Sequence, residues 1–349
     1  MRSVFGNNIK ITIEGGSHEE QMSVTIEGLP EGVPVDMKEL QRFMDRRAPG
    51  NSPFATSRKE PDIPEQVSDD PLKFIIRNTD IRSDDYNNVR HVPRPGHADF
   101  TAYIKYGDKI NMAGGGPFSA RMTAPLCVAG GIALQLLRQH GIKICSHIFS
   151  IGDIYDEPFD PCMTDTPDIN DISFPVISED AGEEMKEEIL AARTEKDSIG
   201  GVTETAVLGL PPGLGGPMYD GAESVLSPIL FGIPAVKGVE FGSGFAASYL
   251  RGSENNDPFV MENGQVKTLT NHHGGILGGI TSGMPLIVRT AFKPTPSIGI
   301  PQQSVDLETG KSADLIVKGR HDPCVAVRGI PAVEAAVAIG LLDMIMEYK

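Results

Sequence analysis

The feature that most constrains this chain is a glycine-rich stretch, residues 271–285, with five glycines, two histidines and no formally charged residue. Glycine at this density weakens helices and strands, so it marks a backbone that bends sharply or lies against another group. Successive N–H groups in such a segment can hold an anion. A flexible surface loop is the plain alternative. Because the basic, proline-containing segments 293–297 and 318–324 follow, we interpret the stretch as part of a site for an anionic ligand.

Composition limits the partners of this site. The chain has 349 residues, enough to bury a large core, and its net charge of −16 argues against nucleic acid and anionic membranes. The four cysteines show neither a C-x-x-C pair nor regular spacing, which predicts reduced thiols in a cytoplasmic protein, without a disulfide framework or a zinc site. We find no signal peptide and expect no apolar run of membrane-spanning length.

Two histidines fall in turns that contain glycine. Residues 9–14 and 22–27 alternate with period two, which predicts a hairpin with His18 at its turn. His97 lies in a second rigid turn, residues 94–99. A histidine in a turn is usually just solvated, but neighbouring glycines allow a ligand to approach it.

Two helix ends are candidate anion sites. A capping box at Asp36 predicts a helix that ends on Arg46 and Arg47, where basic side chains also suit the helix dipole. Three glycines, residues 114–116, lead into Arg121 and a helix to about residue 139. Glycines before a helix N-terminus are a recurrent, though weak, sign of anion binding.

The remaining periodicity predicts strands and helices without strict alternation, which favours an α+β fold with antiparallel sheets. The predicted strands are 72–78, 100–106, 142–151, 202–208 and 235–241, and the further helices are 180–196, 221–231 and an apolar one from Pro331 to about Glu347. Residues 242–247 nearly match a dinucleotide fingerprint and would suggest a nicotinamide-dependent oxidoreductase. The helix after them ends too soon for a βαβ unit, so we discount this match.

Nine short segments, in order along the chain, together resemble the chorismate synthase family. They are Gly16-Ser17-His18 with Glu27-Gly28-Leu29-Pro30, Asp45-Arg46-Arg47-Ala48-Pro49-Gly50, Arg58-Lys59-Glu60-Pro61-Asp62, Arg94-Pro95-Gly96-His97-Ala98-Asp99, Gly114-Gly115-Gly116 with Ser119-Ala120-Arg121, Gly252-Ser253-Glu254, the stretch 271–285, Lys293-Pro294-Thr295, and Gly319-Arg320-His321-Asp322-Pro323-Cys324. Each segment alone is weakly specific, but their shared order is strongly so.

The resemblance implies a single domain over residues 1–349, a β-α-β sandwich with helices between antiparallel sheets, and a homotetramer. It implies conversion of 5-enolpyruvylshikimate 3-phosphate into chorismate and phosphate by an anti-1,4-elimination. It also implies reduced FMN as cofactor, without net redox change, and NADPH is a candidate reductant. A substrate with a phosphate and two carboxylates needs a local cluster of basic residues, which agrees with the arginines found above.

The resemblance also assigns roles to residues. The catalytic ones are His18, which protonates the leaving phosphate, His97, which interacts with the reduced flavin, and Asp322, which helps to relay the ring proton. An ion pair with Arg320 is the plain alternative for Asp322. The expected cofactor-binding residues are Pro117, Phe118, Ser119, Pro234, Ala235, Gly278, Lys293, Pro294, Thr295, Pro296, Ser297 and Arg320. The expected substrate-binding residues are Arg46, Arg47, Arg58 and Arg121. No metal is expected.

The chain departs from the family pattern beside the expected flavin. Pro117-Phe118-Ser119 replaces the usual Arg-Ser-Ser, and Pro234-Ala235 replaces the usual Asn-Ala. Gly16-Ser17-His18-Glu19 replaces Glu-Ser-His-Gly, and the segment between Asp62 and Asn78 is shorter. These changes spare His18, His97 and Asp322. They leave two readings open, a divergent active enzyme and a non-catalytic homologue that binds a flavin or an anion.

Overall fold

The computed structural model describes residues 2–30, 32–49, 54–56, 59–80, 91–109, 111–169, 172–317 and 321–347. The segments near the N-terminus that alternate with period two form strands of its first antiparallel sheet. The predicted hairpin is confirmed, because β2 (Lys10–Gly15) pairs with β3 (Gln21–Glu27). The predicted β5 (Leu72–Arg77) pairs with the other edge of β3. Two strands that we did not predict, β1 (Arg2–Phe5) and β4 (Glu65–Asp69), complete the order β1-β2-β3-β5-β4.

The second sheet is also antiparallel and has the order β7-β6-β8-β14-β9. The predicted strands 142–151, 202–208 and 235–241 are confirmed. The members of the sheet are β6 (Lys143–Ile151), β7 (Ile154–Tyr155), β8 (Gly201–Leu208), β9 (Val236–Phe241) and β14 (Leu286–Phe292). Because β9 pairs antiparallel with β14, the segment after β9 is not a dinucleotide-binding βαβ unit.

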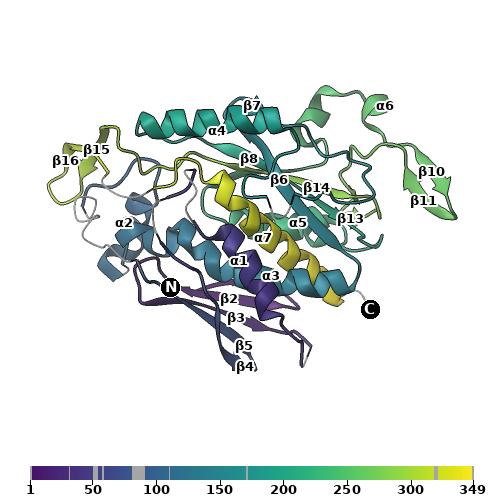
Figure 1. Cartoon of the computed structure of the whole chain (residues 1–349), viewed down its shortest axis with the longest axis horizontal. Coiled ribbons are helices and arrows are strands. Elements are labelled where there is room, and N and C mark those ends of the chain that lie inside the picture. The colour runs from purple at the N-terminus through teal and green to yellow at the C-terminus, as the bar shows by residue number, and fades with distance from the viewer. Residues whose placement is uncertain are drawn as a thin grey trace.

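Three helices lie between the two sheets (Figure 1), and their buried side chains form one core with those of both sheets. They are α1 (Met37–Arg47), α3 (Thr123–Gln139) and α7 (Ala326–Glu347), while α5 (Ala222–Phe231) packs on α7 and α4 (Glu179–Thr194) lies against β6 and β7. The predicted cap of α1 is confirmed, since the carboxylate of Asp36 accepts hydrogen bonds from the N–H groups of Lys38 (2.9 Å) and Glu39 (3.0 Å). The structure therefore has the predicted α+β sandwich.

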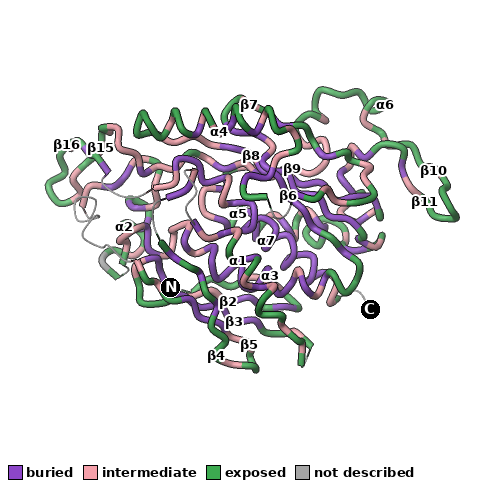
Figure 2. Tube along the Cα trace, in the orientation of Figure 1, coloured by how far each residue is buried: buried purple, intermediate pink, exposed green. Residues whose placement is uncertain are grey.

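Two of these helices correct an expectation about membranes. Ala120–Gln139 and Ala326–Glu347 are long and apolar enough to cross a bilayer by length and composition. In the structure 83% and 89% of their apolar windows are buried, and the central tubes of Figure 2 are correspondingly purple. They are core helices, because the sheets replace the apolar surroundings that a membrane would supply. The second helix also begins five residues before Pro331, at Ala326.

The predicted strand 100–106 is wrong, because these residues form the helix α2 (Asp99–Tyr106). Its aromatic and β-branched residues favour a strand by local propensity. The helix instead buries Ala102, which is 2% exposed, and leaves Phe100 and Ile104 facing outward. Its first residue, Asp99, is anchored by hydrogen bonds to Arg94 and His97. These contacts within the turn before the helix hold its start where the residue preferences predict an extended chain.

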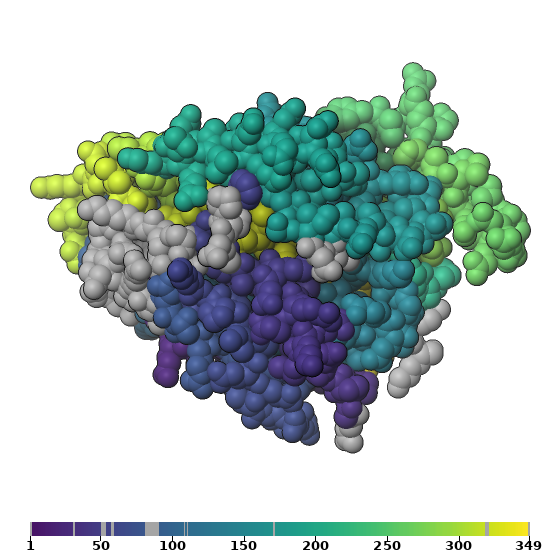
Figure 3. All heavy atoms as spheres, in the orientation of Figure 1, coloured from purple at the N-terminus to yellow at the C-terminus, as the bar shows by residue number. Residues whose placement is uncertain are grey.

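Short hairpins extend from the sandwich. The β10–β11 hairpin, Phe259–Glu262 with Gln265–Thr268, follows the short helix α6 (Gly252–Asn255) and stands out from the body at the right of Figure 3. The glycine-rich stretch 271–285 contains the small hairpin of β12 (Ile276–Leu277) and β13 (Ile280–Thr281). A third hairpin, β15 (Gln302–Asp306) with β16 (Lys311–Leu315), precedes α7.

Candidate active site

A partly open cavity of about 270 Å³ lies near the N-terminal end of α7. Its lining comes from the end of α1 and the loop after it, the turn before α2, the glycine-rich 3₁₀ segment before α3, the loop before β9, the loop after β14 and the start of α7. These segments are distant in the sequence, so the packing of the helices between the sheets assembles the cavity.

The glycines before α3 hold the first predicted histidine. A Cβ on Gly114 would lie 2.0 Å from Cε1 and 2.3 Å from Nδ1 of His18, so only glycine allows this contact, and its φ of +61° also favours glycine. The Oγ of Ser17 donates a hydrogen bond to the Gly114 carbonyl (3.2 Å) and lies 3.1 Å from Nδ1 of His18. The turn between β2 and β3 therefore presses the His18 imidazole against backbone that lines the cavity.

His97 lines the cavity directly and belongs to a buried network. Its Nδ1 lies 2.7 Å from Oδ1 of Asp99, an acceptor, which leaves Nε2 available. Nε2 would lie 3.1 Å from a Cβ on Gly115, so the glycine segment contacts this ring too. Arg94 holds Asp99 with its Nε (2.7 Å) and Nη2 (2.8 Å).

The network sets the charges of its members. Burial, together with the nearby positive charges of Arg94 and Lys293, lowers the pKa of His97 despite the opposing effect of Asp99. Burial by itself would raise the pKa of Asp99, but hydrogen bonds from Arg94 and His97 hold that pKa well below its usual range. At neutral pH His97 is therefore a neutral imidazole beside an ionised carboxylate, a suitable state for accepting a proton.

Asp322 also lines the cavity, as an ion-paired carboxylate. Its Oδ1 accepts a hydrogen bond from the backbone N–H of Thr56 (2.8 Å), and Nη1 of Arg328 lies 2.9 and 3.1 Å from its two oxygens. Arg328 in turn donates from Nε to the carbonyl of Arg47 (3.1 Å). The described ion-pair partner of Asp322 is thus Arg328, in the first turn of α7.

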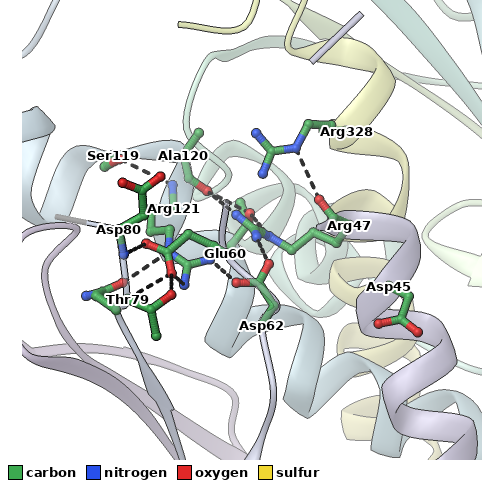
Figure 4. Close-up of polar contacts among 12 residues, drawn as sticks. Asp45, Arg47, Glu60, Asp62, Thr79, Asp80, Ser119, Ala120, Arg121 and Arg328 are labelled. Atoms are coloured by element: carbon green, nitrogen blue, oxygen red, sulfur yellow. Dashed lines mark hydrogen bonds and ion pairs between the residues drawn. The ribbon is translucent and has the colours of Figure 1, made fainter. Parts of the chain in front are cut away.

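Two of the predicted arginines meet at one carboxylate (Figure 4). Arg47, from α1, and Arg121, from the segment before α3, both donate to Asp62, one to each carboxylate oxygen. Glu60 lies 3.5 Å from Nη2 of Arg121 and accepts hydrogen bonds from the backbone and hydroxyl of Thr79 (both 2.9 Å). Both arginines line the cavity although their side chains are nearly buried.

Most of the predicted site residues surround this one cavity. Those that line it are Arg47, His97, Phe118, Ser119, Arg121, Pro234, Ala235, Lys293, Thr295, Pro296, Ser297 and Asp322. His18 is not among the lining residues, but its ring contacts Gly114, which lines the cavity. Pro117 and Pro294 are neighbours in sequence of lining residues. Arg58 and Arg320 lie outside the described residues.

Two predicted residues are placed elsewhere. Arg46 is turned to the helical layer, where its Nη1 and Nη2 bind Glu334 of α7 (2.7 and 2.9 Å). Gly278 lies in the turn between β12 and β13. None of residues 271–285 is among the described residues that line the cavity, and their predicted part in the site stays a prediction. The strand β14 separates the two regions, since the stretch precedes it and Lys293 follows it.

Sequence reasoning missed the carboxylates and arginines that hold the site together. Asp62 and Arg94 stand in the segments that resembled the family, but we gave them no role. Arg328 lies only six residues after Asp322, in the first turn of α7, which begins at Ala326. In the described part of the chain no three His, Cys, Asp or Glu side chains form a group that could hold a metal ion.

A cavity lined by buried arginines, a neutral histidine and an ion-paired aspartate defines an enzyme site for a small anionic molecule. Residues 9–346 match the family model described as chorismate synthase, and the chain belongs to the chorismate synthase family.

Its relatives and a solved structure agree over the whole length. Chorismate synthase of Lancefieldella parvula is 43% identical, with 100% of this chain and 97% of the relative covered. Chorismate synthase of Thermococcus kodakarensis is 43% identical over 99% of this chain and 98% of its own. A crystal structure of a chorismate synthase superposes with a TM-score of 0.77 at 26% identity, covering 98% of this chain and 93% of that chain.

Proposed function

We propose that this chain converts 5-enolpyruvylshikimate 3-phosphate into chorismate and phosphate, in the pathway to aromatic amino acids. The observation that carries the proposal is the placement of His18 and His97 against one glycine segment, beside a cavity that also contains Arg47, Arg121 and Asp322. The reaction removes a phosphate and a ring proton from opposite faces. It therefore needs an acid for the phosphate, a group that takes up the proton, and cations that hold the anionic groups.

We assign these tasks to the chain's own residues. His18 donates a proton to the departing phosphate, and its imidazole is held in place by Ser17 and Gly114. Arg47 and Arg121 bind anionic groups of the substrate. Asp322 accepts the ring proton, and its ion pair with Arg328 orients its carboxylate.

The lining also fits reduced FMN. Phe118, Pro234, Ala235 and Pro296 give the cavity an apolar wall for a flat ring system, and Lys293 offers a cation that is hydrogen-bonded to the Gly96 carbonyl (3.0 Å). When bound, the reduced flavin supplies electron density to the substrate. His97, which is neutral and has Nε2 available, faces this space and would contact the flavin.

Phosphate release under anaerobic conditions tests the proposal. With chemically reduced FMN we expect equal amounts of phosphate and chorismate and no net flavin oxidation. Stoichiometric oxidation of flavin or NADPH would contradict it, and so would binding of FMN and substrate without turnover. The same assay with NADPH as the sole reductant determines whether the chain reduces its own flavin.

We further propose a homotetramer in the cytoplasm. All four cysteines are free thiols, which suits a reducing compartment. The β10–β11 hairpin exposes Phe259 and Met261, at 68% and 70%, and such apolar side chains suit burial between subunits. If Gly278 contacts the cofactor, its place beyond β14 requires that the contact cross to a neighbouring subunit. Light scattering should give a tetramer, and Gly278→Ala should weaken FMN binding only in the assembled form.

A further inference from the structure

The cluster of charged residues around Asp62 contains a buried hydrogen-bond donor that has no acceptor among the described residues. Nη2 of Arg121 is buried and makes no hydrogen bond with any described residue, and the nearest carboxylate oxygen, of Glu60, is 3.5 Å away. A buried N–H group of a guanidinium that lacks an acceptor is costly, and such groups usually have a partner. Because Arg121 lines the cavity, a bound anion can supply that acceptor.

The backbone conformation of Asp62 directs its side chain into the protein interior. Its side chain is fully buried, and its backbone has a φ of +51°, a left-handed conformation that aspartate and asparagine adopt more readily than other non-glycine residues. From this position one carboxylate oxygen reaches Arg47 and the other reaches Arg121 (Figure 4). Burial by itself would raise the pKa of Asp62, but the charges of Arg47 and Arg121 lower it, so the bridging carboxylate is ionised.

The Nε group of each arginine is hydrogen-bonded as well. Nε of Arg47 donates to the hydroxyl of Thr123 (3.0 Å), and Nε of Arg121 donates to the side-chain oxygen of Asn78 (3.1 Å). Nη2 of Arg47 also donates to the Ala120 carbonyl (3.4 Å). Each arginine is therefore held at more than one point, and the point they share is Asp62. Without the negative charge of Asp62, the two buried cations would repel each other, and the Nη1 group of each arginine would lack its partner.

We propose that Asp62 is a positioning residue, which holds Arg47 and Arg121 at the separation that the anionic substrate requires. The inference rests on the proposed function, because the substrate used to test it is 5-enolpyruvylshikimate 3-phosphate. Asp62 would not contact the substrate itself. Its effect should therefore appear mainly in substrate binding and much less in the chemical step.

The variant Asp62→Asn tests this role, because asparagine keeps the shape and tolerates the left-handed backbone while removing the charge. A charge-assisted hydrogen bond lost at a binding site corresponds to about one to two decades in affinity. We expect KM, and the Kd from calorimetry without flavin, to rise about ten- to hundred-fold, while kcat changes less than about threefold. If Asp62→Asn does not fold, Thr123→Val loosens Arg47 more gently and should raise KM about three- to tenfold.

Glu334→Gln is the matched control. It breaks the ion pair of Glu334, which is buried in α7, with the partly exposed Arg46, the neighbour of Arg47 on α1. Neither residue is among those that line the cavity. The variant should lower the melting temperature as Asp62→Asn does, but leave KM unchanged. Unchanged KM and Kd in Asp62→Asn, or in Thr123→Val, would overturn the positioning role. Absence of turnover by the wild-type chain would instead overturn the proposed function.

Discussion

The two glycine-rich segments of this chain look alike in sequence and differ in what they touch. Gly114 and Gly274 share a φ of +61°, and neither has room for a side chain. The space beside Gly114 is filled by the His18 imidazole, whereas the space beside Gly274 is filled by the backbone of Gly242. One segment holds an imidazole beside the cavity, and the other joins two loops. Glycine density therefore indicates a close approach but not the nature of the group that approaches.

The largest effect is expected for Gly114→Ala. The added methyl group would occupy the position of the His18 ring, so the ring must leave its place against Gly114. We expect kcat with chemically reduced FMN to fall by about two to four orders of magnitude, as for loss of an acid–base group. Circular dichroism should show a folded protein. Activity close to that of the wild type would mean that the position of His18 does not matter.

Gly274→Ala should affect stability instead of chemistry. Its Cβ would lie 2.3 Å from the Gly242 nitrogen, and backbone atoms cannot move aside as a flexible side chain can. Overpacking and the left-handed backbone together should cost about 2–4 kcal/mol of unfolding free energy. Denaturant titration measures this loss. Activity per folded molecule should stay within about threefold, and a large loss of kcat would erase the distinction between the segments.

Each segment also has a histidine beside it or within it. These are His97 at the cavity and His273 in residues 271–285, and burial lowers the pKa of both. Between the lowered folded pKa and the ordinary value of 6.5, the unfolded state binds more protons. This contribution to stability is therefore complete above pH 6.5 and is lost as pH falls below it. Replacing either residue with glutamine should flatten the fall in stability on acidification. Only His97→Gln should also change the pH profile of kcat.

The smallest effect is expected for Gly141→Ala. Gly141 has a φ of +74°, but a Cβ there would have no atom within 4 Å. The substitution should lower the unfolding free energy by about 1–2 kcal/mol, the cost of a left-handed backbone for alanine. It should leave kcat unchanged. A loss of activity as large as that in Gly114→Ala would show that backbone strain alone explains the first result.

Local patterns predicted most of the sandwich. Period-two alternation located β2 and β3, and Asp36 marked the start of α1. Prediction failed for α2, where hydrogen bonds of Asp99 with Arg94 and His97 hold the start of a helix against strand propensity. The expectation that no apolar run reaches membrane-spanning length was also wrong, because two core helices are long and apolar enough to cross a membrane.

The site was predictable only in part. Resemblance identified His97 and Arg121 because they stand in short segments of the sequence. It did not show that Asp62 bridges Arg47 and Arg121, because those partners are 15 and 59 residues away. It also did not show which of two glycine segments lies at the cavity, because that depends on how β14 separates them. Contacts of this kind are a product of packing and have no local signal.

The most direct test of the account is turnover by His18→Ala and His97→Ala with chemically reduced FMN, beside His272→Ala as a control. His272 belongs to residues 271–285 and bonds the carbonyl of Asn255 (3.1 Å), away from the cavity. We predict a fall in kcat of about two to four orders of magnitude for the first two variants and less than about threefold for the third. Activity near that of the wild type in either His18→Ala or His97→Ala would contradict the account.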